Sequence, residues 1–173
     1  MRSEQRRAAI LSTLQQETAP VSASTLARQY GVSRQIIVGD VALLRAAGAD
    51  IAATPRGYVL SRAAAGGGVT RQVACNHRAE DMVEELNLCV DQGCAVLDVV
   101  VEHPVYGQLV GQLQLYSRYD VQQFAARLEA ERAHALSELT DGIHLHTLRC
   151  PDEAAYQRVC QALEQAGFLY KEG

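Results

Sequence analysis

Two histidines stand one residue apart in the stretch GIHLHT, residues 142–147. In a β-strand, residues i and i+2 point to the same face, so the imidazoles of His144 and His146 would lie side by side. Such a pair suits a metal site, a catalytic pair, or two polar residues on a solvated sheet face. The choice depends on which other side chains reach that face.

A carboxylate is the first candidate partner. The stretch HRAEDMVEELNLCVDQG, residues 77–93, predicts a helix in which Met82, Leu86 and Cys89 form a core-facing apolar stripe. Glu85 lies on this stripe, whereas the other acids of the helix lie on the opposite side. A buried carboxylate is costly unless it is paired or bound to a cation, so Glu85 needs a partner.

Three imidazoles are available to provide that partner. His77, at the start of the helix, would join His144 and His146 around Glu85. Three nitrogens and one carboxylate suit a divalent transition metal such as Zn, Ni, Fe, Co or Mn. The alternative is a lone buried ion pair between Glu85 and one histidine, with two solvated strand histidines, and spacing alone does not decide between the two.

The other two histidines lie on other expected elements. His134 falls within a long helix predicted over residues 120–139, on a solvated face. His103 precedes Pro104 in a turn, where it is either a loop residue or a ligand contact.

The charge of the chain changes sign along its length. The 173 residues suffice for one medium or two small domains. Residues 1–62 carry eight arginines against four acids, whereas residues 63–173 carry eight basic residues against sixteen acids. A basic first third indicates a module that binds a polyanion. The small, uncharged run at 63–68 predicts a linker, which gives domains at 1–62 and 69–173.

The composition is typical of a cytoplasmic protein. No apolar run approaches the roughly 18–20 residues that span a bilayer, so we expect no membrane segment. The N-terminus MRSEQRR lacks the apolar region of a secretory signal. The five cysteines form no Cys-x-x-Cys pair, which favours free thiols in a reducing compartment.

The first third has the pattern of a winged helix-turn-helix. A helix is predicted over residues 3–16, followed by a short helix that ends at Tyr30 and Gly31 and a longer one over residues 33–47. The stretch DIAATPRGYVL then turns at residues 54–57 and predicts the hairpin of a wing. A small helical packing domain is the alternative.

Four residues of this domain are predicted to contact DNA. Ser33, Arg34 and Gln35 begin the second helix of the motif, and Arg56 lies at the tip of the wing. Arg and Gln side chains reach base edges, and a helix N-terminus also accepts a phosphate. Arg6 and Arg28 are further candidates for phosphate contact, which would complete the interface with DNA.

The remaining hundred residues mix strands and helices. Strands are predicted at 70–76, 95–103, 107–116 and 143–150, with a short last strand at 168–172. Helices are predicted at 77–93, 120–139 and 151–167. This order predicts an α+β sandwich in which the helices pack on one sheet.

Four stretches together resemble one family: VSRQIIVGDVALLRAAGADIAATPRGY, CNHRAEDMVEEL, EHPVYG and LSELTDGIHLHT. They resemble the niacin-responsive transcriptional repressors, in which a winged helix-turn-helix is joined to a three-histidine (3H) domain. The resemblance spans almost the whole chain. It implies a homodimeric cytoplasmic repressor of genes for NAD biosynthesis or niacin uptake, with nicotinic acid as co-repressor. The metal site of the family maps onto His77, Glu85, His144 and His146.

One position departs from the family pattern. Gly39 stands inside the second helix of the motif, where a longer polar residue is expected. The operator sequence therefore cannot be carried over from the family.

The leading hypothesis is a repressor gated by a ligand rather than an enzyme. An open coordination position on the metal would take nicotinic acid, and His103 and Tyr106 would hydrogen-bond its other end. One alternative is a metal-responsive regulator that uses the same residues. A metal-dependent hydrolase would need a general base, and no second carboxylate is placed for that role. A structural repressor without a ligand would leave Glu85 unexplained.

Overall fold

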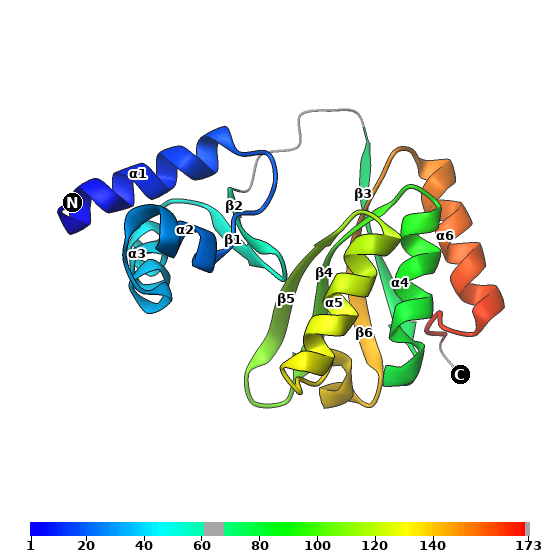
Figure 1. Cartoon of the computed structure of the whole chain (residues 1–173). Helices are drawn as coiled ribbons and strands as arrows, with labels where there is room; N and C mark the ends of the chain where they lie inside the picture. Colours follow the sequence, from blue (N-terminus) through cyan, green and yellow to red (C-terminus); the bar gives the residue numbers. More distant parts are fainter. Residues whose placement is uncertain (61–67, 172–173) are drawn as a thin grey trace. The chain divides into compact units, whose positions relative to one another are not determined.

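The computed structural model describes residues 1–60 and 68–171 (Figure 1). The chain divides into two compact units, Met1–Ala65 and Gly66–Gly173. Of the predicted linker at 63–68, only Gly68 lies within the described residues. None of the described helices is long and apolar enough to cross a membrane.

The N-terminal unit consists of three helices followed by a hairpin. Its elements are α1 (Ser3–Gln16), α2 (Ala23–Tyr30), α3 (Arg34–Ala46), β1 (Ile51–Thr54) and β2 (Gly57–Leu60). Gly31 ends α2 in the left-handed conformation, at φ 64°. The Ser33 hydroxyl caps α3 by accepting a hydrogen bond from the Ile36 amide. These elements form the predicted winged helix-turn-helix, around a core that includes Ile10, Leu14, Leu26, Ile37 and Val41.

One predicted phosphate contact in this unit was wrong. Arg6 is buried, and its Nε donates to Asp40 Oδ2 at 2.6 Å while Nη2 donates to Oδ1 at 3.3 Å. The two side chains are only 10% and 5% exposed. Arg6 therefore joins α1 to α3 instead of facing solvent. Arg28 remains exposed on α2.

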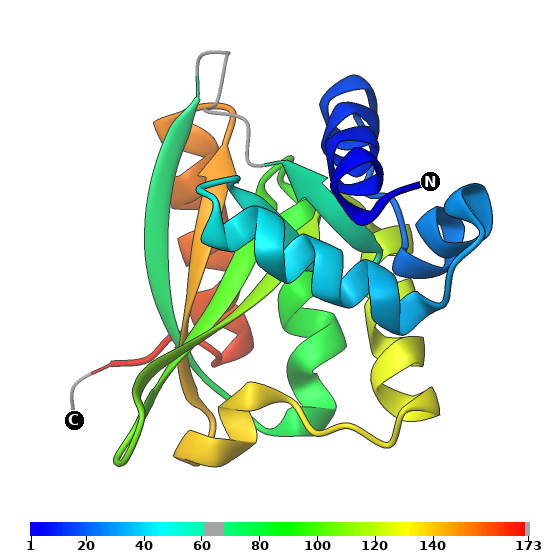
Figure 2. The same ribbon diagram turned by 90° about the vertical axis from the view of Figure 1, so that its left-hand side faces the viewer.

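The C-terminal unit is a four-stranded antiparallel sheet with helices on one face (Figures 1 and 2). The strands are β3 (Val69–Asn76), β4 (Ala95–His103), β5 (Gly107–Leu115) and β6 (Ile143–Cys150), in the order β3-β6-β4-β5. The helices are α4 (Met82–Asp91), α5 (Arg118–Ala130) and α6 (Glu153–Ala166). Two short 3-10 helices are η1 (Ala79–Asp81) and η2 (Leu136–Thr140). The predicted α+β sandwich is confirmed.

The register of the sheet places the strand histidines on its helix-covered face. His144 on β6 pairs with Cys75 on β3, and His146 pairs with Val73 on β3 and with Val99 on β4. Val73 and Cys75 belong to the apolar core between the sheet and the helices. Both histidines are therefore turned toward α4 rather than toward solvent.

The helix predicted over residues 120–139 ends early, at Ala130. Arg132 adopts a left-handed conformation at φ 50°, and the Ala133 amide donates to the Leu128 carbonyl at 2.8 Å. This pattern is a Schellman motif, which is usually built with glycine. The chain then turns back as η2, so His134 lies in a connection and not on a helix. Of the last strand predicted at 168–172, the described residues 168–171 form one bridge, between Leu169 and Cys75.

We expect Arg6→Met to lower the melting temperature of the protein by several degrees, because it leaves Asp40 buried without its closest partner. Arg7 Nη1 lies 3.8 Å from Asp40 Oδ1 and is the weaker partner of that carboxylate. The double variant Arg6→Met/Asp40→Leu should recover most of the loss, because neither charge then remains buried. Thermal unfolding followed by circular dichroism measures both. A single variant as stable as the wild type would contradict the structural role of the pair.

Candidate metal centre

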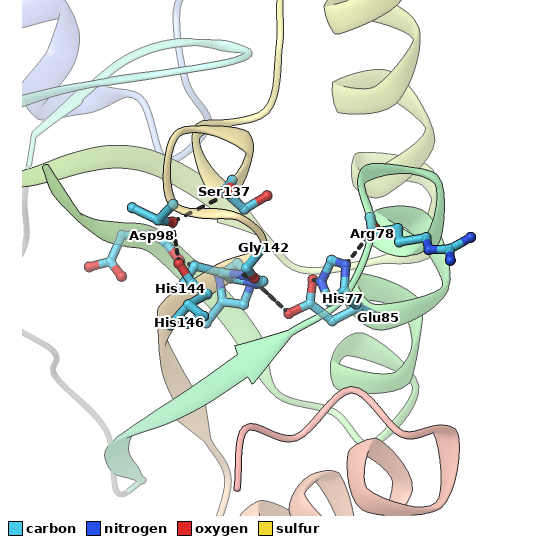
Figure 3. A network of polar contacts seen from close by, with 10 residues as sticks. His77, Arg78, Glu85, Asp98, Ser137, Gly142, His144 and His146 are labelled. Atoms are coloured by element: carbon cyan, nitrogen blue, oxygen red, sulfur yellow. Dashed lines mark hydrogen bonds and ion pairs between the residues drawn. The ribbon is translucent and has the colours of Figure 1, made fainter. Parts of the chain in front are cut away.

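Three imidazoles surround one buried carboxylate in the C-terminal unit (Figure 3). Glu85, on α4, is 1% exposed. His77 follows β3 and places Nε2 2.6 Å from Glu85 Oε2. His144 and His146, on β6, place Nε2 2.8 Å and 3.0 Å from Oε1. Each of the three histidines that the sequence predicted as metal ligands thus contacts Glu85, the fourth predicted ligand.

The second nitrogen of each imidazole contacts a main-chain carbonyl. The Nδ1···O distances are 2.7 Å for His77 with Arg78, 2.8 Å for His144 with Gly142, and 2.7 Å for His146 with Asp98. A carbonyl oxygen only accepts, so each Nδ1 must carry the proton. In the neutral imidazoles, Nε2 is then a lone pair directed at the carboxylate. This arrangement is typical of metal-ligating histidines.

The Nε2 lone pairs of the neutral imidazoles repel the negatively charged Glu85 carboxylate. The cluster therefore needs a source of positive charge. One source is protonation. Burial opposes the charged form of His77 and His146, but their contacts with Glu85 outweigh burial and raise the pKa of both. Burial also opposes the Glu85 carboxylate, yet the three histidines, with His146 foremost, hold its pKa well below the ordinary range.

The other source of positive charge is a cation. Within the described part of the chain, His146 Nε2 is buried without a hydrogen-bond partner. Its 3.0 Å contact with Glu85 has the distance of an ion pair but not the geometry of a hydrogen bond. An unpartnered nitrogen, two further imidazole nitrogens and one carboxylate form a donor set that fits a divalent transition metal.

The sequence reasoning missed a neutral neighbour of this cluster. Cys75 is buried, and its Sγ lies within 4.8 Å of ligand atoms of Glu85 and His144. Burial and the Glu85 charge raise the pKa of the Cys75 thiol, so it stays protonated and can donate to the carboxylate. Its place beside Glu85 follows from the register between β3 and β6, in which Cys75 pairs with His144.

The sequence reasoning also missed Gly142, which helps to place two of the candidate ligands, His77 and His144. Its φ is +94°, and a Cβ there would lie 2.4 Å from the His77 carbonyl oxygen and 2.8 Å from Asn76 Oδ1. The chain entering β6 therefore passes directly against the main chain of His77. The Gly142 carbonyl also orients His144. Only glycine permits both the backbone conformation and the close approach.

A largely apolar cavity of about 200 Å³ opens onto the cluster. Its walls include Met82 of α4, Phe124 of α5 and Leu136 of η2. Leu136 fits closely over β5, because a Cβ on Gly111 would lie 2.9 Å from its Cδ1. Because α5 ends early, the returning chain forms part of the cavity wall. His134 and Ser137 of the same connection also line it.

The structure does not bring the predicted effector contacts to this cavity. His103 and Tyr106 flank the turn between β4 and β5, with ring centroids 5.0 Å apart. His103 Nδ1 accepts hydrogen bonds from the Val105 amide at 3.1 Å and the Tyr106 amide at 3.2 Å. His103 thus stabilises its own turn, and neither residue is among the described residues that line the cavity.

The predicted DNA contacts lie on the N-terminal unit. Arg34 and Gln35 are exposed in the first turn of α3. The Ser33 hydroxyl is engaged in the helix cap, and Arg56 lies in the turn between β1 and β2, partly buried. Contact of these residues with DNA stays a prediction.

We expect Gly142→Ala to weaken the binding of Zn²⁺ or Ni²⁺ by about tenfold to a hundredfold, because the added Cβ separates His77 from His144. Isothermal titration calorimetry on protein stripped with a chelator measures the affinity. Gly107→Ala is the matched control, because Gly107 also has a positive φ but a Cβ there meets no described atom within 4 Å. Equal losses in the two variants would show that backbone strain, not ligand placement, is responsible.

Comparison with known proteins agrees with both units. The 3H domain family matches residues 70–172, and an HTH domain family matches residues 6–59. The transcription repressor NadR of Bacillus subtilis (strain 168) is 45% identical over 169 residues, which are 96% of this chain and 94% of that protein. The probable transcription repressor NiaR of Thermotoga maritima is 43% identical over 172 residues, which are 98% and 96% of the two chains. The chain therefore belongs to the niacin-responsive family of transcription repressors, regulators rather than enzymes, in which a helix-turn-helix domain precedes a 3H domain.

Proposed function

We propose that this protein is a cytoplasmic, homodimeric repressor of genes for NAD biosynthesis or niacin uptake, with nicotinic acid as its co-repressor. The proposed effector site is the cavity beside Glu85. One observation carries the proposal: an apolar cavity opens onto a buried cluster of three imidazoles and one carboxylate.

A divalent transition metal would be held by Nε2 of the three histidines and by Glu85. When bound, it would offer an open coordination position to the ring nitrogen or the carboxylate of the effector. The chain's own residues place the ligands, since three carbonyls fix the imidazoles in the tautomer that exposes Nε2. The candidate metals are Zn, Ni, Fe, Co and Mn, and elemental analysis of the purified protein distinguishes them.

The cavity suits a small aromatic acid in size and polarity. In another protein, an apolar cavity of 150 Å³ holds a benzene ring. About 200 Å³ therefore has room for a pyridine ring with one carboxyl group. Phe124, Met82 and Leu136 provide apolar walls for the faces of the ring.

Charge favours the acid over its amide. No Lys or Arg is among the described residues that line the cavity. A divalent cation beside the single carboxylate of Glu85 would leave one net positive charge in these apolar surroundings. A monocarboxylate neutralises that charge, whereas nicotinamide does not.

Gating would act through the dimer. In the proposed repressor, effector binding in the C-terminal unit fixes the spacing of two helix-turn-helix units over a two-fold operator. A coupling free energy of about 1–3 kcal/mol is enough for a useful switch.

The rival function is a metal sensor. The unpartnered His146 nitrogen favours it, because a metal alone would satisfy the cluster. Under this alternative, operator binding follows metal occupancy and is indifferent to nicotinic acid.

We expect Zn²⁺ or Ni²⁺ to raise the melting temperature, and to raise it more at pH 8 than at pH 6. Without metal, the raised pKa values of His77 and His146 give an ion-pair contribution that is fully present below the unfolded value of 6.5. That contribution is lost as pH rises through the folded pKa values. Metal needs unprotonated Nε2, so its contribution grows with pH.

Differential scanning calorimetry of chelator-treated and metal-loaded protein measures this difference. Glu85→Gln, which keeps the side-chain volume but removes the negative charge, should abolish most of the gain. A gain that is larger at pH 6 would contradict the assignment of the imidazoles as metal ligands.

We expect nicotinic acid to raise the affinity of metal-loaded protein for operator DNA by about fivefold or more. The probe is a duplex enriched from a random pool by the wild-type protein, and affinity is followed by fluorescence anisotropy. Nicotinamide should have a much smaller effect. Gly111→Val should lose the response while keeping the metal, because the added side chain pushes Leu136 into the cavity.

Two results would overturn parts of this proposal. DNA affinity that is unchanged by saturating nicotinic acid but lost on chelation would favour the metal sensor. A Gly111→Val protein that responds like the wild type would place the effector outside this cavity.

A further inference from the structure

One stripe along the exposed side of α3 carries almost no side chains after the first turn, between larger neighbours such as Ile36 and Leu43, which are 43% and 55% exposed. Ile37, Asp40, Val41 and Leu44 are buried against the domain core. The residues on the opposite side of the helix follow the helical spacing i, i+4, i+7 and i+11, and all are exposed: Gln35, Gly39, Ala42 and Ala46. One polar side chain is thus followed by three residues that carry at most a methyl group.

Gly39 has no explanation within the fold. Its φ lies outside the left-handed region, and a Cβ at this position would meet no atom of the described chain within 4 Å. Gly142 differs in both respects, since its φ is positive and a Cβ there would clash. A glycine in an exposed helix interior destabilises the helix relative to alanine. Neither a positive φ nor a close neighbour requires glycine at position 39, so nothing in the fold offsets the lower helix stability.

The place of α3 in the helix-turn-helix unit suggests which partner approaches the main chain at Gly39. α3 is the second helix of the helix-turn-helix unit, the one that enters the major groove in DNA complexes of this class. Its inner side is occupied by the domain core, so the side of Gly39 is available to the groove.

We propose that Gly39 marks the point where the main chain of α3 lies in van der Waals contact with base edges, so that the lack of a side chain determines which operator is bound. Within α3, hydrogen-bonded reading of bases then falls to Arg34 and Gln35 in the first turn. Around Gly39 and Ala42 the helix can make only apolar and shape-dependent contacts, such as those with a thymine methyl group. The inference rests on DNA binding by the proposed repressor and not on its co-repressor.

A series of increasing side-chain volume tests this inference in the full-length protein. The probes are the duplex enriched from a random pool by wild-type protein and a scrambled duplex of equal length. We expect Gly39→Ala to lower affinity for the enriched duplex by about tenfold, and Gly39→Leu to lower it further. Affinity for the scrambled duplex, which depends on phosphate contacts, should hardly change.

Stability separates this role from a structural one. Gly39→Ala should raise the melting temperature by a few degrees while it weakens specific binding, because alanine favours the helix. Ala126→Leu is the control for added exposed bulk, since Ala126 lies on an exposed part of α5 in the other unit. It should leave affinity for both duplexes unchanged.

The outcomes that overturn the inference are distinct from failure of the repressor itself. If Gly39→Ala binds the enriched duplex as tightly as wild type, or loses affinity equally for both duplexes, α3 does not approach the bases at residue 39. If the wild-type protein enriches no duplex at all, both the repressor function and the inference fail.

Discussion

A carboxylate buried among three imidazoles constrains the whole C-terminal unit. Glu85 is almost fully buried, and the main-chain contacts of His77, His144 and His146 direct Nε2 of each ring toward it. Such a cluster is stable only with added positive charge, as protons or as a metal ion. Because its members come from α4, from the end of β3 and from β6, any occupant of the cluster joins segments that are distant in the sequence.

The three orienting carbonyls come from irregular points of the backbone. Arg78 precedes a 3-10 helix, Gly142 lies in a left-handed turn, and Asp98 follows a register shift in β4. Regular strands and helices use their carbonyls within their own ladders, so irregular segments are where carbonyls become available to side chains. The deviations from ideal structure in this unit therefore determine the tautomers of its histidines, and through them the chemistry that the cluster can support.

Local periodicity predicted the buried face of Glu85 and the shared face of the two strand histidines, but not the residues that place and surround them. Glu85 was found from the helical stripe of α4, and the strand histidines from their two-residue spacing. Cys75 depends on the register between β3 and β6, which is a long-range property. The end of α5 was missed because Arg132 stands in a left-handed position where glycine is the usual signal. The cavity wall formed by η2 follows from that same turn.

The buried charges are balanced in the N-terminal unit but not in the C-terminal unit. In the N-terminal unit, Arg6 and Asp40 neutralise each other inside the fold, so the arginines left to meet a polyanion are exposed ones such as Arg34. In the C-terminal unit, one carboxylate faces three imidazoles, and a divalent cation bound there would exceed the single negative charge of Glu85. A net charge beside apolar walls is unfavourable until an anion arrives. Under the proposed function, a metal bound at this centre would therefore bring the positive charge that a small carboxylate neutralises.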